Sequence, residues 1–244
     1  MVGSRLRDWL GAFSTLVHPP HCDGCDAPVE RLSWLCGDCT RQAEAHRIKA
    51  PHCAICSEPF EGAIDATFDC PNCHDRRFRF TCAVAVLQAR EVVREMVHHF
   101  KYEGRYHLRE PLGVWLAQAF DDPRLAGDPI DALVPVPLHP RRQRERGFNQ
   151  AFELAQLAGA RRGLPVDELL QRTRYTSTQT RHARRDRVEN LRGAFAIRKG
   201  ALVIGRHLVL IDDVFTTGST VDECALVLKR AGAASVRVAT VARA

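Results

Sequence analysis

The spacing of apolar residues changes along this chain, and these changes predict where its strands and helices lie. After residue 78, short continuous apolar runs alternate with longer segments whose apolar residues recur every three or four positions. The runs predict strands at Cys82–Leu87, Ile130–Val136, Ala194–Ile197, His207–Ile211 and Ser235–Val241. The longer segments predict helices at Glu91–Phe100, Leu108–Phe120, Asn149–Ala160 and Ser219–Ala231. This alternation predicts an α/β fold with a parallel sheet, which binds ligands at the carboxyl ends of its strands.

The part of the chain before residue 79 follows a different pattern. It is rich in cysteine and turn residues and has little apolar periodicity, so we expect two domains, 1–78 and 79–244. Arg5–Val17 is apolar on one face, which favours a short helix packed on the body over a helix lying on a membrane surface. No apolar stretch approaches the roughly 20 residues of a membrane-spanning helix. We therefore expect a cytoplasmic protein without stable membrane insertion.

Eight of the ten cysteines form four C-x2-C pairs. The pairs are Cys22/Cys25, Cys36/Cys39, Cys53/Cys56 and Cys70/Cys73. Two such pairs supply the four thiolates of a tetrahedral Zn²⁺ site, and a small module with little apolar core needs such a staple. The spacing thus predicts two structural zinc ions in preference to disulfides or redox chemistry. Consecutive pairing is the simplest arrangement, and interleaved pairing stays open.

Basic residues are concentrated between His139 and Gly200. This segment has 15 Lys and Arg against 6 Asp and Glu, whereas the whole chain has a net charge of +6. Such a segment suits a phosphate-rich ligand or a nucleic acid, with a solvated basic face as the ordinary alternative.

The run Val209–Thr220 (VLIDDVFTTGST) joins a buried strand to a helix. Two carboxylates, Asp212 and Asp213, follow the strand and can accept hydrogen bonds from vicinal sugar hydroxyls. The loop after them is made of Thr216, Thr217, Gly218, Ser219 and Thr220. Hydroxyls and free amides at a helix N-terminus form an anion site, and glycine lets the backbone approach a phosphate closely. The run predicts a site for a 5-phosphorylated ribose, with a capped turn as the alternative.

The motif IDDVFTTGST resembles the phosphoribosyl diphosphate motif of type I phosphoribosyltransferases. Three further stretches, together with the cysteine pairs, resemble the ComF family, whose members are linked to natural transformation and the use of imported DNA. They are HHFKYEGRY (His98–Tyr106), VPVPLHPRRQRERGFNQA (Val134–Ala151) and TRYTSTQTRHARRDRVENLRGAF (Thr173–Phe195). The resemblance implies a type I phosphoribosyltransferase-like parallel sheet flanked by helices in 79–244, after an N-terminal helix and zinc ribbon in 1–78.

The same resemblance assigns roles to residues. Asp212 and Asp213 would be the catalytic pair that holds the ribose hydroxyls, and Thr216–Thr220 would hold the 5-phosphate. The pyrophosphate loop around residues 137–142 would include Pro137, Leu138, Arg141 and Arg142. Residues 173–187 would form the loop that closes over the substrate. Further phosphate contacts are expected from Lys101, Arg146, Arg181 and Arg185, and Mg²⁺ would be held mainly by substrate oxygens.

Two functions follow from these features. The first is binding of phosphoribosyl diphosphate with Mg²⁺ and transfer of the phosphoribosyl group to an unidentified acceptor during DNA uptake. The alternative is a non-enzymatic protein that binds single-stranded DNA among the proteins of the uptake machinery and uses the sugar-phosphate pocket as a sensor. Stacking aromatics are expected of such a protein, but the basic segment has only four, Phe148, Phe152, Tyr175 and Phe195, which is thin support for a single-strand groove.

Overall fold

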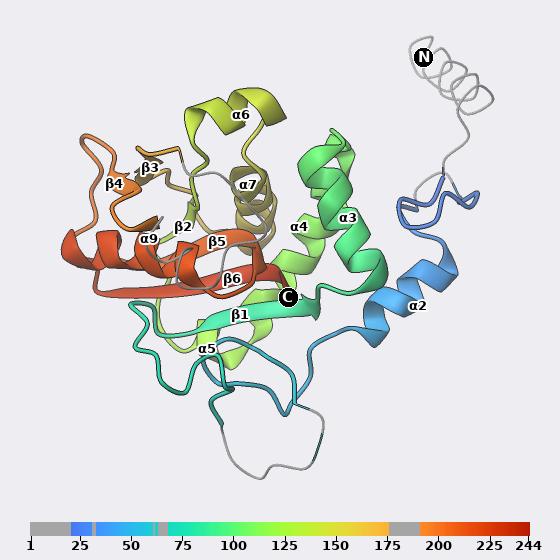
Figure 1. Cartoon of the computed structure of the whole chain (residues 1–244), viewed down its shortest axis with the longest axis horizontal. Coiled ribbons are helices and arrows are strands. Elements are labelled where there is room, and N and C mark those ends of the chain that lie inside the picture. The colour runs from blue at the N-terminus through green and yellow to red at the C-terminus, as the bar shows by residue number, and fades with distance from the viewer. Residues whose placement is uncertain (1–20, 31–32, 61, 63–67, 176–190) are drawn as a thin grey trace.

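A parallel four-stranded sheet forms the centre of the molecule (Figure 1). The structure is a computed structural model and describes residues 21–30, 33–60, 62, 68–175 and 191–244. The strand order is β1 (Ala83–Gln88), β6 (Ser235–Arg243), β5 (His207–Phe215) and β2 (Ala132–Pro135). Continuous apolar runs predicted these strands because a parallel sheet is covered on both faces.

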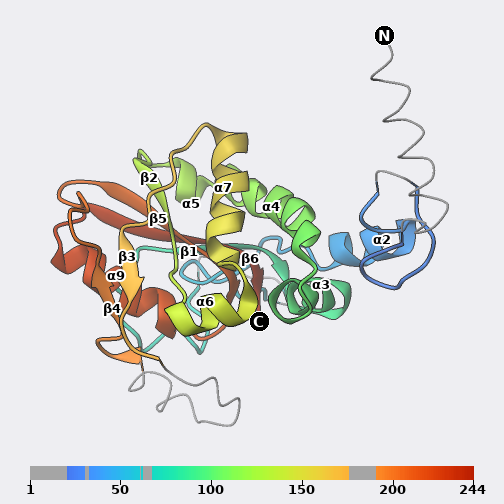
Figure 2. The same cartoon turned by 90° about the horizontal axis from the view of Figure 1, so that it is seen from above.

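Helices cover both faces of this sheet (Figures 1 and 2). One face packs against α3 (Glu91–Tyr102), α4 (Arg109–Gln118) and α7 (Gln150–Arg162). The other packs against α9 (Ser219–Arg230) and the antiparallel hairpin of β3 (Leu170–Arg172) and β4 (Phe195–Ile197). The short helices are α2 (Gly37–Ala45), η1 (Tyr106–Leu108), η2 (Ala119–Asp121), α5 (Pro123–Ala126) and α6 (Pro140–Arg146). Within the part of the chain that the structure describes, no helix is both long and apolar enough to cross a membrane.

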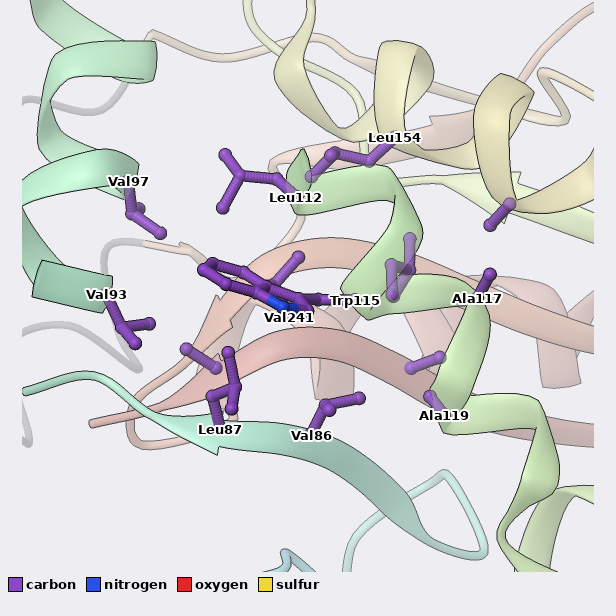
Figure 3. Packing of buried hydrophobic residues seen from close by; sticks show 14 of the residues in the cluster. Val86, Leu87, Val93, Val97, Leu112, Trp115, Ala117, Ala119, Leu154 and Val241 are labelled. Atoms are coloured by element: carbon purple, nitrogen blue, oxygen red, sulfur yellow. The ribbon is translucent and has the colours of Figure 1, made fainter. Parts of the chain in front are cut away.

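The core on the α4 side is built around a tryptophan. Trp115 of α4 lies beside Val241 of β6, with Val86 of β1 and Val97 of α3 nearby (Figure 3). Burying a large apolar side chain of this kind contributes roughly 1.5–3 kcal/mol. The apolar faces predicted from the helical spacing therefore meet the sheet and hold α3 against it.

Helix α6 differs from the prediction, which made residues 137–142 a loop. The chain is helical from Pro140 because proline suits the first turn of a helix. His139 Nδ1 accepts a hydrogen bond from the backbone N–H of Arg141 at 3.2 Å, and Gly147 ends the helix with a φ of 87°. These end signals were present in the sequence, but the helix has no apolar face, so periodicity did not reveal it.

The free edge of β1 is covered by the cysteine-rich module. Ser57 Oγ donates to the carbonyl of Ala83 at 2.9 Å and accepts from the backbone N–H of Ala85 at 3.2 Å. The backbone N–H of Ala83 donates to the carbonyl of Ile55 at 2.7 Å, and residues 46–48 pair farther along the strand. Because an exposed edge is a template for pairing with another chain, this cover removes a route to aggregation.

The two groups of cysteines belong to different cores. The first ribbon, defined by Cys22, Cys25, Cys36 and Cys39, contributes buried residues to the core with α3, α4 and α7. The second ribbon, defined by Cys53, Cys56, Cys70 and Cys73, belongs to the core with α9 and the β3–β4 hairpin. Each ribbon therefore supports a different face of the sheet.

Candidate functional site

Strand β5 is four residues longer than its predicted range and carries both aspartates inside its pairing with β6. Asp212 pairs with Thr240, and Val214 pairs with Ala242. Each aspartate accepts a hydrogen bond through Oδ1 from the next backbone N–H, at 2.9 Å for Asp212 and 2.8 Å for Asp213. The two carboxylates are thus fixed at the carboxyl end of the sheet, where parallel α/β folds bind ligands.

The buried carboxylate of Asp213 is paired with Lys101 from the last turn of α3. Asp213 is 2% exposed, and Lys101 Nζ lies 2.7 Å from its Oδ2. Burial by itself would lower the pKa of Lys101, but the charge of Asp213, the hydrogen bond to it and the charge of Asp212 together raise this pKa. The structure therefore brings the predicted Lys101 to the two aspartates, as a stable cation.

Asp212 has a different electrostatic setting. Burial, and then the charge of Asp213, raises the pKa of Asp212 to about 7, although the charge of Lys101 opposes the shift. Its carboxyl group is therefore divided between the ionised and protonated forms near neutral pH. Its charge also acts on Arg172 and Cys224, so Asp212 lies close to the β3–β4 hairpin and α9.

The predicted phosphate loop, residues 216–220, turns from β5 into α9. Gly218 is the N-cap residue of α9 and has a φ of 78°, in the left-handed region that favours glycine. It offers no side chain to the first amides of the helix, so these amides face the loop with the positive end of the helix dipole. Thr217 Oγ1 and Ser219 Oγ lie 2.9 Å apart. Amides and hydroxyls thus converge beside the aspartates, as an anion site requires.

The arginines of α6 form the far side of this region. Arg141 forms an ion pair with Glu145 at 3.0 Å and lies over the ring of Tyr175, with 5.0 Å between its guanidinium carbon and the ring centroid. Arg142 lies over the same ring at 5.7 Å. Before α6, Pro137 is buried and Leu138 is half-buried. These residues follow β2, the strand beside β5, as the prediction required.

Arg146 is the last arginine of α6. It donates a hydrogen bond to Gln150 and lies 5.2 Å from the ring centroid of Tyr102, the residue after Lys101. The remaining two predicted arginines, Arg181 and Arg185, lie outside the described residues.

The sequence interpretation missed Arg172 on β3. Burial and the charge of Arg142 lower its pKa, while the charges of Cys224 and Asp212 oppose the shift, so Arg172 is within electrostatic range of Arg142 on α6 and of Asp212. Its guanidinium carbon is 5.4 Å from the ring centroid of Phe195 on the paired strand. The sequence feature that could have identified Arg172 was a basic residue in a short apolar segment. That signal is weak because β3 has only three residues.

Each ribbon brings its four sulfur atoms together. Within each set, the four Sγ atoms lie within 4.8 Å of one another, which identifies consecutive pairing. Cys25 and Cys36 have Sγ atoms 3.6 Å apart, and for Cys56 and Cys70 the separation is 3.5 Å. A tetrahedral site with Zn–S bonds of about 2.3 Å has sulfur atoms roughly 3.8 Å apart. All ten cysteines are free thiols. The residues present therefore fit two structural zinc sites.

Comparison with known families identifies both the C-terminal α/β domain and the cysteine-rich module. The family model described as phosphoribosyl transferase domain matches residues 144–244, and the model described as double zinc ribbon domain matches residues 13–77. A solved structure of glutamine phosphoribosylpyrophosphate (PRPP) amidotransferase from B. subtilis, complexed with ADP and GMP, shares 23% identity. That match covers 53% of this chain and 25% of the other, with a TM-score of 0.35.

Curated relatives match over nearly their whole length. The chain is 33% identical over 227 residues to the DNA utilization protein YhgH of Escherichia coli O6:H1, covering 91% of this chain and 96% of that protein. It is 29% identical over 215 residues to competence protein F of Haemophilus influenzae, covering 86% and 90%. With its zinc ribbons and its phosphoribosyltransferase domain, the chain therefore belongs to the ComF family, which includes these two proteins.

Proposed function

We propose that this chain binds phosphoribosyl diphosphate with Mg²⁺ and transfers the phosphoribosyl group to an acceptor in the uptake and use of DNA. The observation that carries the proposal is the pair of adjacent carboxylates, Asp213 buried and Asp212 partly buried, directly before a loop of hydroxyls and amides at the N-terminus of α9, with Lys101 paired to Asp213. The names of the relatives, DNA utilization protein and competence protein, support the biological setting.

Each part of the site then has a task. Asp212 and Asp213 accept hydrogen bonds from the ribose hydroxyls, and the amides and hydroxyls of residues 216–220 hold the 5-phosphate. Lys101 holds the Asp213 carboxylate in place through their ion pair. The carboxylate oxygens are donors that Mg²⁺ prefers, and the ion would neutralise the diphosphate together with the substrate oxygens that hold it.

Transfer breaks the bond between C1 of the ribose and the diphosphate oxygen. The electron pair of this bond leaves with the diphosphate, while a nucleophilic atom of the acceptor bonds to C1 and gives its proton to solvent. Arg142 and Arg172 stabilise the charge on the leaving diphosphate, because cations positioned before the reaction stabilise developing negative charge most effectively. The contribution of this chain is therefore to position the sugar and accommodate the departing charge.

Calorimetry with phosphoribosyl diphosphate and Mg²⁺ tests the binding step. We expect the wild-type protein to release binding heat and the double variant Asp212→Asn/Asp213→Asn to lose it. Asp121→Asn is a matched control, because this carboxylate is 65% exposed and pairs with Arg162 on α7. Equal heats for the wild type and the double variant would contradict the proposed site. Pyrophosphate release, screened over purines, pyrimidines and pyridines, then tests transfer.

The tyrosines favour a second function, binding of single-stranded DNA. All three tyrosines of the chain are exposed, by 39% to 64%, and each has an arginine over its ring. The pairs are Tyr102 with Arg146, Tyr106 with Arg109 and Tyr175 with Arg141. Bases stack on such rings while guanidinium groups contact phosphates. We expect the double variant Tyr102→Ala/Tyr175→Ala to weaken oligonucleotide binding in an anisotropy assay. Binding that does not weaken with added salt would contradict phosphate contact.

A further inference from the structure

The segment that leaves the second ribbon lies directly against the phosphate loop. Arg76, three residues after Cys73, donates a hydrogen bond from Nη1 to the carbonyl of Thr217 at 2.6 Å. Arg79 donates its backbone N–H to Oδ1 of Asp222, in the first turn of α9, at 2.6 Å. The segment after the second ribbon is thus hydrogen-bonded both to the backbone of the loop and to the first turn of the helix that follows the loop.

Aromatic rings lie against the phosphate loop at Gly218. Phe78 stacks on Phe80, with ring centroids 4.7 Å apart, and Phe80 meets the edge of Phe215, at the end of β5, at 6.0 Å. The guanidinium of Arg76 lies 4.2 Å from the ring centroid of Phe78. A Cβ added at Gly218 would lie only 3.2 Å from Phe78 and 2.6 Å from Phe215. The loop backbone therefore rests on an aromatic layer that the ribbon segment supplies in part.

The turn that carries Cys70 and Cys73 also holds Arg76 in place. The backbone N–H of Arg76 donates to the carbonyl of Cys73 at 3.0 Å, and that of His74 donates to Cys70 at 3.0 Å. Arg76 Nη1 also lies 3.4 Å from Oδ1 of Asn72, which stands between the two cysteines of that pair. A continuous path of contacts therefore runs from the sulfur ligands through Asn72 and Arg76 to Thr217.

The first ribbon makes no matching contact in the described residues and lies elsewhere in the fold. It packs against α3, where a Cβ at Gly24 would come within 2.4 Å of Val92. Asp23 pairs with His107 of η1 at 2.7 Å. The two ribbons thus support different elements, and the first serves as an internal control for the second.

We propose that the metal-loaded second ribbon fixes the conformation of the phosphate loop, with Arg76 as the positioning residue. This inference rests on the proposed function for its ligand, the 5-phosphate of the sugar. The loop amides bind a phosphate only when their N–H groups point to one place, and the bond from Arg76 to the Thr217 carbonyl orients the peptide unit between Thr217 and Gly218.

Hydrogen exchange of the ligand-free full chain tests this positioning directly. We expect amides of residues 216–220 to exchange about tenfold faster in Arg76→Ala, the factor that corresponds to loss of a hydrogen bond from a charged donor. Arg77→Ala is the matched control, since Arg77 is the exposed neighbour. Both variants should keep two zinc ions per chain. Exchange in Arg76→Ala equal to the wild type would overturn the inference, whatever the protein binds.

Binding of two simple ligands distinguishes positioning of the phosphate loop by Arg76 from a general destabilisation of the protein. Arg76→Ala should bind ribose 5-phosphate about tenfold more weakly and bind inorganic pyrophosphate with Mg²⁺ as the wild type does, because the contacts proposed for the pyrophosphate come from the α6 side. Arg76→Lys, which keeps a cationic donor, should restore part of the affinity for ribose 5-phosphate. Equal weakening of both ligands would contradict a role confined to the loop. Failure of the wild type to bind either ligand would instead overturn the proposed function, and the exchange comparison would still decide the positioning.

A substitution in each ribbon provides the second comparison. Cys70→Ser in the second ribbon should accelerate exchange of residues 216–220, whereas Cys25→Ser in the first ribbon should accelerate exchange in residues 23–30 and leave the loop unchanged. Equal effects of the two variants on the loop would refute a specific link between the second ribbon and the loop.

Discussion

Gly218 combines two constraints at one residue, a positive φ and a lack of space for a side chain. An alanine there would pay about 1–2 kcal/mol for the left-handed conformation and roughly 1–3 kcal/mol for overlap with Phe215. We therefore expect Gly218→Ala to lower the free energy of unfolding by at least about 2 kcal/mol. Chemical denaturation of the purified variant measures this change.

Gly200 provides the control for this prediction. It has a φ of 83° but no neighbouring atom within 4 Å of a Cβ. Gly200→Ala should therefore cost only the conformational part, about 1–2 kcal/mol. If the free energy of unfolding falls by the same amount in both variants, the close approach of Phe215 to the loop does not contribute to stability.

The carboxyl group of Asp212 predicts a pH dependence of ligand binding. Only the ionised form accepts hydrogen bonds from both ribose hydroxyls, and burial raises the pKa of Asp212 to about 7. The ratio of phosphoribosyl diphosphate affinities between the wild type and Asp212→Asn should therefore be largest near pH 8 and shrink toward pH 6. Calorimetry at several pH values measures this ratio, in which titration of the ligand cancels. A ratio that does not vary with pH would contradict the assignment.

The same shift has a consequence for stability. Because the pKa of Asp212 is raised on folding, its favourable contribution is complete below the pKa of the unfolded chain, about 3.9. It is lost as the pH rises through about 7. Asp212→Asn should therefore become more stable relative to the wild type as the pH rises from about 4 to about 7, as followed by thermal unfolding.

At the scale of elements, Ser57 joins the second ribbon to β1. Its hydroxyl is fully buried, donates to Ala83, and accepts from Ala85 and from Nη2 of Arg124 at 2.9 Å. Ser57→Ala leaves the buried N–H of Ala85 without its acceptor and the buried carbonyl of Ala83 without its donor, so we expect a loss of about 1–3 kcal/mol in the free energy of unfolding. Ser33→Ala, at an exposed position, should change it little. Equal stability of the two variants would show that the contact is dispensable.

The elements differ in how well they could be predicted from the sequence. Strands β1, β2, β5 and β6 were predictable because burial on both faces leaves a continuous apolar run. Helix α6 and strand β3 were not, since α6 is polar throughout and β3 is very short. The last four residues of β5 were missed because two are aspartates, which are unusual in strands and are held there by pairing with β6.

At the scale of the whole molecule, the two zinc sites should release their metal at different rates. In the first ribbon Cys25 is exposed and Cys36 is partly exposed, whereas every cysteine of the second ribbon is at most 2% exposed. A chelator should therefore remove one zinc ion quickly and the other only as the core opens. The absorbance of a zinc-binding dye, recorded over time, should rise in two phases of equal size.

Cys25→Ser assigns the phases, because it should abolish the fast one and leave the slow one. Release of both ions in a single phase would show that the two ribbons open together. Retention of the fast phase in Cys25→Ser would reverse the assignment.

The sequence by itself determined the class of fold, the eight cysteine ligands for zinc and the run Asp212–Thr220. These signals are local, since strand burial, C-x2-C spacing and a loop before a helix are written in neighbouring residues. The tertiary structure decided the partners: consecutive cysteine pairs, Lys101 against Asp213, Arg172 near Asp212 and Arg76 under Thr217. Such contacts join residues that are far apart in the chain, and no periodicity encodes which of many arginines meets a given loop. Only the packing of the helices, the hairpin and the ribbons around the sheet selects them.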